Sequence, residues 1–211
     1  MDDTVSAEAH LKVIRSLMER ATVYRAISSA TAAVGGLASI AAAVYLITRN
    51  IPDPWEFLII WGAVLLITVS ANAYFISLGA EKRGEPFFSR GMKTTLIGAI
   101  PSLGSGGLMT FVLFNTCGVA WCSAFWMMFY GLALVSSFHF APRSVLWLGL
   151  AFLLSSWTIL LLLFWDLIQV EYPAYTGSYL MAGSFGLLHL IYAVATWPRK
   201  GGFMAALELN R

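Results

Sequence analysis

The residues of this 211-residue chain that could do chemistry form two groups. One is a pair of cysteines, Cys117 and Cys122, in a short stretch between two apolar runs. The other consists of residues embedded in apolar runs: Asn72, Pro101, Ser102, Ser105 and His189. Neither group matches a catalytic motif, and no metal-ligand cluster or phosphate-binding glycine loop is present in the sequence. We therefore predict a protein that is not an enzyme, with no catalytic residue, no bound metal and no cofactor.

The spacing of Cys117 and Cys122 predicts a structural disulfide. If the segment faces an oxidising compartment, a disulfide there can persist. Closing so short a loop stabilises a fold by about 2 kcal/mol in the chain-entropy model. A redox pair is less favoured, because such pairs typically use C-x-x-C and the chain has no other cysteine to relay electrons. Two free buried thiols are the remaining alternative.

The stretch Gly98–Gly107 is predicted to be the weakest helix of the chain, because it holds four glycines and Pro101. An interior glycine costs about 1 kcal/mol and an interior proline about 3 kcal/mol. We expect the stretch to be kinked or locally unwound in the middle of the membrane. The polar groups at a similar depth are Asn72, Ser102, Ser105 and His189. A broken helix of this kind can bind a solute, and the alternative is a packing kink in which enlarging Gly104 or Gly106 would destabilise the bundle.

His189 is predicted to face other helices, because it shares a helical face with Ala182, Gly186 and Ala193. A polar residue inside a membrane bundle suggests a ligand contact. The alternative is a hydrogen bond to a neighbouring hydroxyl or carbonyl group. A haem held jointly with His139 is disfavoured, because the two histidines differ in depth by roughly 10 Å. A serine hydrolase is disfavoured because Leu103 precedes Ser105 where a G-x-S-G motif requires glycine.

Composition indicates that membrane-spanning helices position these residues. The chain is 59% hydrophobic and 11% charged, whereas a soluble domain has about 25% charged residues. A span needs roughly 20 apolar helical residues. Six uncharged windows meet that length: 26–48, 57–79, 94–114, 119–140, 144–165 and 176–197. We predict an all-α membrane protein with a six-helix bundle over residues 26–197. The small residues of the first window, Ser29, Ala32, Gly36, Ser39 and Ala43, predict that this helix is central or lies at an oligomer contact.

The basic residues predict the orientation of the bundle. Of the 13 Lys and Arg residues, all but Arg49 fall on one side of the six predicted spans. The positive-inside rule then places both termini in the cytoplasm, and we expect a multi-pass protein of the plasma or inner membrane. Residues 1–25 are predicted to form an amphipathic cytoplasmic helix, and residues 198–211 a cytoplasmic tail.

These features favour a non-enzymatic sensing, scaffolding or regulatory module that acts through its cytoplasmic face. The helix over 1–25 is expected to lie on lipid headgroups, and the alternative is docking of a cytoplasmic partner or a second copy of the chain. The second functional class is a small transporter or channel for an uncharged or apolar solute, with its site at the third span. An intramembrane enzyme is a distant third. No predicted span holds a charged residue, which counts against proton-coupled pumps and voltage sensors. The expected partner is the lipid bilayer, with a second copy of the chain or a cytoplasmic protein as an alternative partner of the helix over 1–25, and no nucleic acid is expected.

Overall fold

The computed structural model describes residues 28–49, 53–83, 90–138, 141–168, 170 and 172–197. All regular structure in these residues is helical. The helices are α2 (Ser29–Thr48), α3 (Pro54–Arg83), α4 (Arg90–Thr116), α5 (Val119–Ser136), α6 (Arg143–Phe164), α7 (Pro173–Met181), η1 (Ala182–Leu188) and α8 (His189–Thr196). The predicted helix over 1–25 and the tail over 198–211 lie outside the described residues.

Six long apolar helices could cross a membrane, one for each predicted span. The last of them is the continuous segment α7–η1–α8, over Pro173–Thr196. Local sequence signals set several of the ends. Ser28 is the N-cap residue of α2, and its hydroxyl oxygen accepts a hydrogen bond from the Thr31 backbone N–H. Pro173 occupies the first turn of α7, where a missing N–H costs nothing. The predicted six-helix architecture is confirmed at this level.

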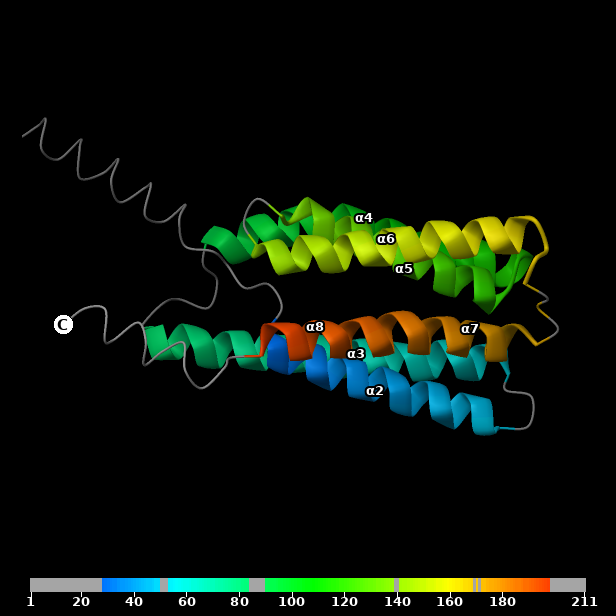
Figure 1. The fold of residues 1–211 in the computed structure, drawn as a ribbon, viewed down its shortest axis with the longest axis horizontal. Helices are drawn as coiled ribbons and strands as arrows, with labels where there is room; N and C mark the ends of the chain where they lie inside the picture. Colours follow the sequence, from blue (N-terminus) through cyan, green and yellow to red (C-terminus); the bar gives the residue numbers. More distant parts are fainter. Residues whose placement is uncertain are drawn as a thin grey trace, which may run out of the picture.

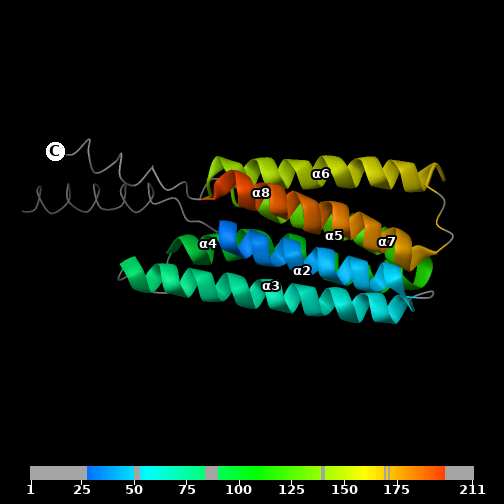
Figure 2. The same ribbon diagram turned by 60° about the horizontal axis from the view of Figure 1, so that its bottom comes forward.

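The helices form two layers (Figure 1). One layer contains α4, α5 and α6, with α5 packed against both of its neighbours. The other contains α2, α3 and the α7–α8 segment, with α2 packed against both of the others (Figure 2). The layers meet chiefly where α5 packs against α7. The start of α2 and the end of α8 lie at the same end of the bundle, as an even number of spans requires (Figure 1).

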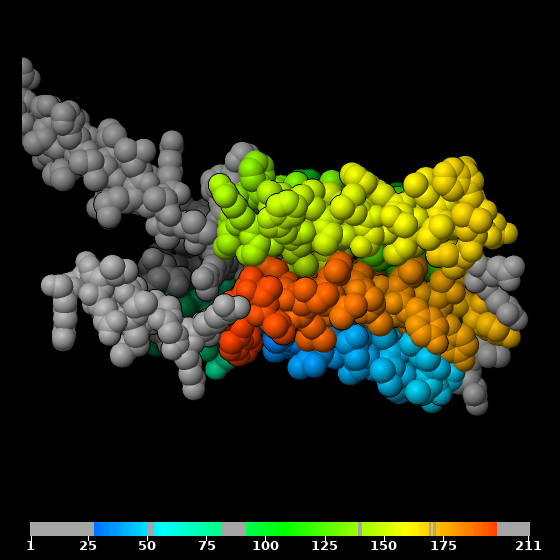
Figure 3. All heavy atoms as spheres, viewed as in Figure 1, coloured from blue at the N-terminus to red at the C-terminus, as the bar shows by residue number. Residues whose placement is uncertain are grey.

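The face that carries α6, α7–α8 and α2 is closed. In the space-filling view these elements lie side by side, and their side chains meet along the seam between the layers (Figure 3). Two glycines allow the closest crossing in this region. A Cβ atom on Gly36 would lie 2.8 Å from Leu190 Cγ, and one on Gly186 would lie 2.5 Å from Ile40 Cδ1. The backbones of α2 and the last span therefore approach as closely as they do because neither position carries a side chain.

The small-residue stripe predicted for the first span is buried at the centre of its layer. Ala32, Gly36, Ser39 and Ala43 are all buried in α2. Gly186, His189 and Ala193 are likewise buried in the last span, on the face predicted to look inward. Spacing of small residues therefore indicated correctly which sides of these two helices face the protein.

The prediction that the third span is locally unwound is wrong, whereas a kink at Pro101 stays a prediction. The helix α4 runs without interruption from Arg90 to Thr116, and Pro101 lies within it on an exposed face. Pro101 has no N–H to donate to the Ile97 carbonyl oxygen four residues earlier. Its ring lies on the exposed side of α4, and the helix continues through it. Beside the proline, the Ser136 hydroxyl of α5 donates to the Gly98 carbonyl oxygen at 3.1 Å, which ties α4 to α5.

The irregular turn lies in the last span instead. Residues Ala182–Leu188 form a π-helix between α7 and α8. Such single-turn widenings of an α-helix are rare and occur often at functional sites. This one contains Gly183 and Gly186, and nothing in the hydropathy of the span had indicated it.

The packing role predicted for the third-span glycines also needs correction. A Cβ atom on Gly104 would meet no atom within 4 Å, so a larger residue there has open space. A Cβ atom on Gly106 would lie 3.1 Å from Phe129 Cβ. Only Gly106 therefore lies where a larger residue would press on a neighbouring helix.

Candidate binding site

A cavity of about 570 Å³ opens between α3 and α4. These two helices are consecutive in the chain but belong to different layers. The helix α3 packs on α2, and α4 packs on α5, so the sides of α3 and α4 that face each other are left apart. The back of this crevice is formed by side chains of α2, α5 and the last span. Because α3 and α4 are also the least buried of the six candidate spans, the crevice lies on an exposed side of the bundle.

Glycines account for much of the empty space. Gly62 of α3 and Gly107 of α4 both line the crevice, and a Cβ atom on either would meet nothing within 4 Å. At both positions a helix therefore presents bare backbone to the crevice. A larger side chain there would occupy the cavity without first colliding with a neighbour.

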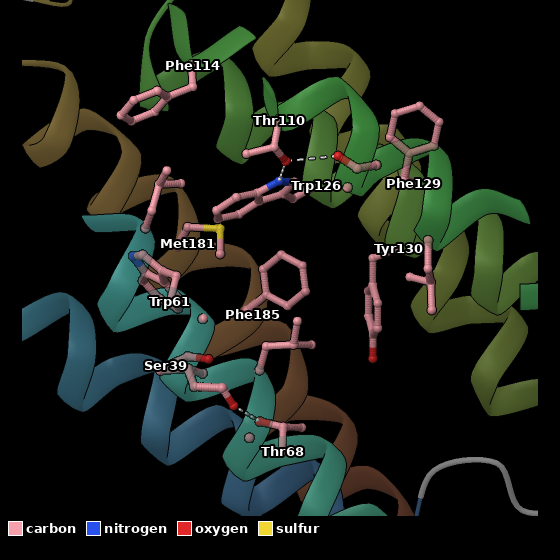
Figure 4. A pocket seen from close by; sticks show the side chains of 18 of the residues that line it. Ser39, Trp61, Thr68, Thr110, Phe114, Trp126, Phe129, Tyr130, Met181 and Phe185 are labelled. Atoms are coloured by element: carbon pink, nitrogen blue, oxygen red, sulfur yellow. Dashed lines mark hydrogen bonds between the residues drawn. The ribbon is translucent and has the colours of Figure 1, made fainter. Parts of the chain in front are cut away.

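Aromatic rings form much of the remaining wall. The rings of Trp61, Trp126, Phe129 and Phe185 surround the crevice (Figure 4). The wall is nearly all carbon, and no Asp, Glu, Lys or Arg residue lines it. A charged molecule would therefore find no counter-ion in the crevice, and its desolvation would go uncompensated.

At one end, Trp55 of α3 and Phe114 of α4 bridge the gap between the two helices. Their ring centroids are 4.6 Å apart, with the rings inclined by 56°. Asn115 lines the same end, but its side-chain amide donates to the Phe111 carbonyl oxygen at 2.8 Å. Two aromatic rings in van der Waals contact therefore cover this end of the crevice.

His189 and Tyr130 form a hydrogen-bonded pair at the wall of the crevice. The Tyr130 hydroxyl lies 2.8 Å from His189 Nε2, and His189 Nδ1 lies 2.9 Å from the Phe185 carbonyl oxygen. A carbonyl oxygen can only accept, so Nδ1 carries the proton and Nε2 accepts the Tyr130 hydroxyl proton. Phe185 belongs to η1, so the histidine ties the irregular turn of the last span to α5.

A second internal pair binds α4 to α5. The Trp126 indole N–H donates to the Thr110 hydroxyl oxygen at 2.8 Å, and that hydroxyl donates to the Gly106 carbonyl oxygen at 2.9 Å (Figure 4). Both groups line the crevice. Their hydrogen bonds are made within the wall, so neither group needs a partner from the space.

The structure does not bring together the polar site that we predicted. Of its residues, only His189 lines the crevice. Asn72 lies elsewhere on α3 and accepts a hydrogen bond from the Thr31 hydroxyl at 3.2 Å. Pro101 and Ser105 are exposed on α4, and Ser102 is half-buried outside the crevice lining. His189 makes the hydroxyl and carbonyl contacts of the alternative interpretation.

The residues that sequence reasoning missed are the crevice glycines and aromatics. Gly62 sits in the middle of the second apolar run, where an uncompensated glycine is unfavourable in a helix. This glycine was the only local indication in the sequence of a space beside the helix. The pattern of the aromatic residues Trp61, Trp126 and Phe129 was the same as that of residues packed in a protein core. No signal in the sequence indicated that α3 and α4 would be held apart.

The predicted disulfide is absent from the structure, in which both cysteines are free thiols. Cys117 follows the end of α4 and is exposed, whereas Cys122 lies in the first turns of α5 and is fully buried. The two sulfurs belong to different environments because α5 begins at Val119 and turns Cys122 toward the interior of the bundle. Across the described ranges, no group of three or more His, Cys, Asp and Glu side chains could hold a metal ion.

No protein-family model matches this chain, and no curated protein or solved structure shows significant similarity to it. The features of the molecule that bear on its function are therefore its six candidate spans and the crevice between α3 and α4.

Proposed function

We propose that this multi-pass membrane protein binds an uncharged, largely apolar molecule that enters the crevice sideways from the bilayer. The observation that carries the proposal is the lateral opening between α3 and α4, backed by a cavity of about 570 Å³. That volume falls within the roughly 300–1,000 Å³ of small-molecule sites in proteins. The protein would then be a non-enzymatic binding module, in which occupancy of the crevice is the signal.

The chemistry of the wall supports this class of ligand. Lipid tails are as apolar as the crevice, so an apolar molecule gains no hydrophobic free energy by leaving the bilayer for the protein. Affinity must come from close contact with the wall, to which each atom pair contributes about 0.1–0.2 kcal/mol. Flat aromatic side chains such as Trp61, Trp126 and Phe129 offer many such contacts at fixed positions. Shape is therefore expected to select the ligand.

The extent of the crevice favours binding over transport. On α3 its lining runs from Trp55 to Thr68, which leaves the remainder of this helix, to Arg83, outside it. At 1.5 Å per residue those 13 steps span about 20 Å, roughly two thirds of a hydrocarbon core of about 30 Å. A transport path would have to continue past Thr68, and the lining ends there.

The test places a bulky residue in the crevice and a matched one outside it. Gly107→Phe fills the cavity, whereas Gly104→Phe adds the same side chain to the same helix at a position that does not line it. The probe is a chain-dibrominated octadecane, whose bromine atoms quench tryptophan fluorescence at contact. Trp55, Trp61 and Trp126 line the crevice and report on binding there.

We expect saturable quenching in the purified wild-type protein and in Gly104→Phe, and a loss of at least tenfold in probe affinity in Gly107→Phe. Unbrominated octadecane should compete with the probe. Equal quenching curves for the two variants would show that the probe binds elsewhere and would contradict the proposal.

A further inference from the structure

Ser39 has a hydroxyl group that faces the crevice. The residue lies near the middle of α2, is only 2% exposed, and lines the cavity. In the close view its oxygen points toward the open space (Figure 4). Among the described residues, this hydroxyl makes no hydrogen bond. The buried indole N–H of Trp61, which also lines the cavity, is likewise without a partner.

Every other buried serine of the described residues is satisfied by a backbone carbonyl oxygen. Ser123, Ser178 and Ser184 donate to the carbonyl four residues earlier at 2.9, 2.7 and 2.7 Å. Ser137 donates three residues back at 2.7 Å, and Ser156 donates across to Ala124 at 2.8 Å. A helical serine normally bonds back to its own helix in this way. Ser39 is the exception, and it is the one that lines the crevice.

An unpaired hydroxyl group at this depth is unfavourable in the empty protein. No water is present in hydrocarbon to satisfy it, and an unpaired polar group there costs several kcal/mol. Thr68, which lies at the same end of the crevice (Figure 4), does not relieve it, because the Thr68 hydroxyl donates to the Val64 carbonyl oxygen at 2.8 Å. A molecule in the crevice could supply the missing partner.

We infer that the ligand carries a hydroxyl or carbonyl oxygen that hydrogen-bonds to Ser39, with the rest of the molecule apolar. This inference rests on the proposed function and narrows its ligand to a neutral, oxygen-bearing molecule that dissolves in the bilayer. A pure hydrocarbon would leave Ser39 unpaired. A phosphate or ammonium group would meet no opposite charge, because the lining holds no ionised side chain.

The experiment compares two probes that differ in a single oxygen. One is a chain-dibrominated octadecanol and the other is the matching dibrominated octadecane, each titrated into the purified full-length protein. The variants are Ser39→Ala and, as a matched control, Ser156→Ala, which removes a buried serine hydroxyl that points at Ala124 and not at the crevice. Melting temperatures of both variants establish that they fold.

We expect wild-type protein and Ser156→Ala to bind the alcohol about fivefold more tightly than the hydrocarbon, the size of one net hydrogen bond. In Ser39→Ala that preference should disappear while hydrocarbon binding is unchanged. If the hydrocarbon binds in the crevice and the alcohol shows no preference in wild type, the Ser39 inference fails and the proposed function stands. If neither probe quenches, both fail.

Discussion

The hydrogen bond between Tyr130 and His189 is the polar contact that joins α5 to the irregular last span. Both residues lie among aromatic rings, with Tyr130 and Phe185 centroids 5.1 Å apart and Phe152 and His189 centroids 5.4 Å apart. His189 is 5% exposed and uses both ring nitrogens. Among the described residues, Tyr130 is the hydrogen-bond partner of Nε2, so its hydroxyl should matter for stability.

We predict that Tyr130→Phe lowers the free energy of unfolding by about 1–3 kcal/mol, because it leaves Nε2 buried without a donor. Thermal unfolding in detergent measures the change. Tyr179→Phe removes the same hydroxyl from a residue that is 60% exposed, and it should alter stability by less than about 0.5 kcal/mol. Equal effects of the two substitutions would contradict the pairing.

The sequence predicted which side of its helix His189 occupies, but it did not predict which residues His189 contacts. Its inward side followed from the small residues spaced around it in the last span. Its partner Tyr130 lies 59 positions away in the chain, and helical periodicity carries no information about which helix packs opposite. The same limit explains Ser105 and Asn72, whose depths were compatible with a common site although their helices face different neighbours.

The helices themselves followed from hydropathy, because each had to supply enough apolar length to cross a bilayer. The irregular turns within the helices did not follow from hydropathy. Intrinsic helix propensity placed the weak turn at Pro101, whereas the structure keeps α4 helical there and widens the last span at Ala182–Leu188. Pro101 lies on the exposed side of α4, where its ring does not enter the packing between α4 and α5, and helix propensity alone did not decide where the helix would break.

The close crossing of α2 with the last span can be tested by adding a side chain at Gly36. Gly36→Val should destabilise the bundle by about 1–3 kcal/mol, the cost of overpacking, because its new side chain would start 2.8 Å from Leu190 Cγ and 3.1 Å from the Gly186 carbonyl oxygen. Gly104→Val is the control, since nothing lies within 4 Å of that position. Melting temperatures compare the two. A harmless Gly36→Val would mean that the helices are farther apart than described.

At the scale of the whole molecule, the division into two layers creates the crevice. The sequence contained the six spans but not their partition, because the choice of neighbours depends on the fit between helix surfaces and not on hydropathy. The consecutive helices α3 and α4 would ordinarily be expected to pack together. Their separation into different layers is what leaves the space behind Trp55 and Phe114.

Orientation in the membrane is a prediction from charge. With all but Arg49 of the basic residues on one side of the spans, we expect both termini to be cytoplasmic. Reporter fusions after residue 211 and before residue 1 should both report the cytoplasm, and a fusion in the segment between α2 and α3 should report the opposite side. A cytoplasmic signal from that internal fusion would overturn the orientation and place the Trp55 end of the crevice in the inner half of the bilayer.

The most direct test of the central claim is an experimental density map of the protein in lipid nanodiscs. We predict that α3 and α4 are separated as described, with elongated density that no side chain accounts for lying between Gly62 and Gly107 and reaching Ser39. A map in which α3 and α4 pack against each other, with the space filled by their own side chains, would contradict the account.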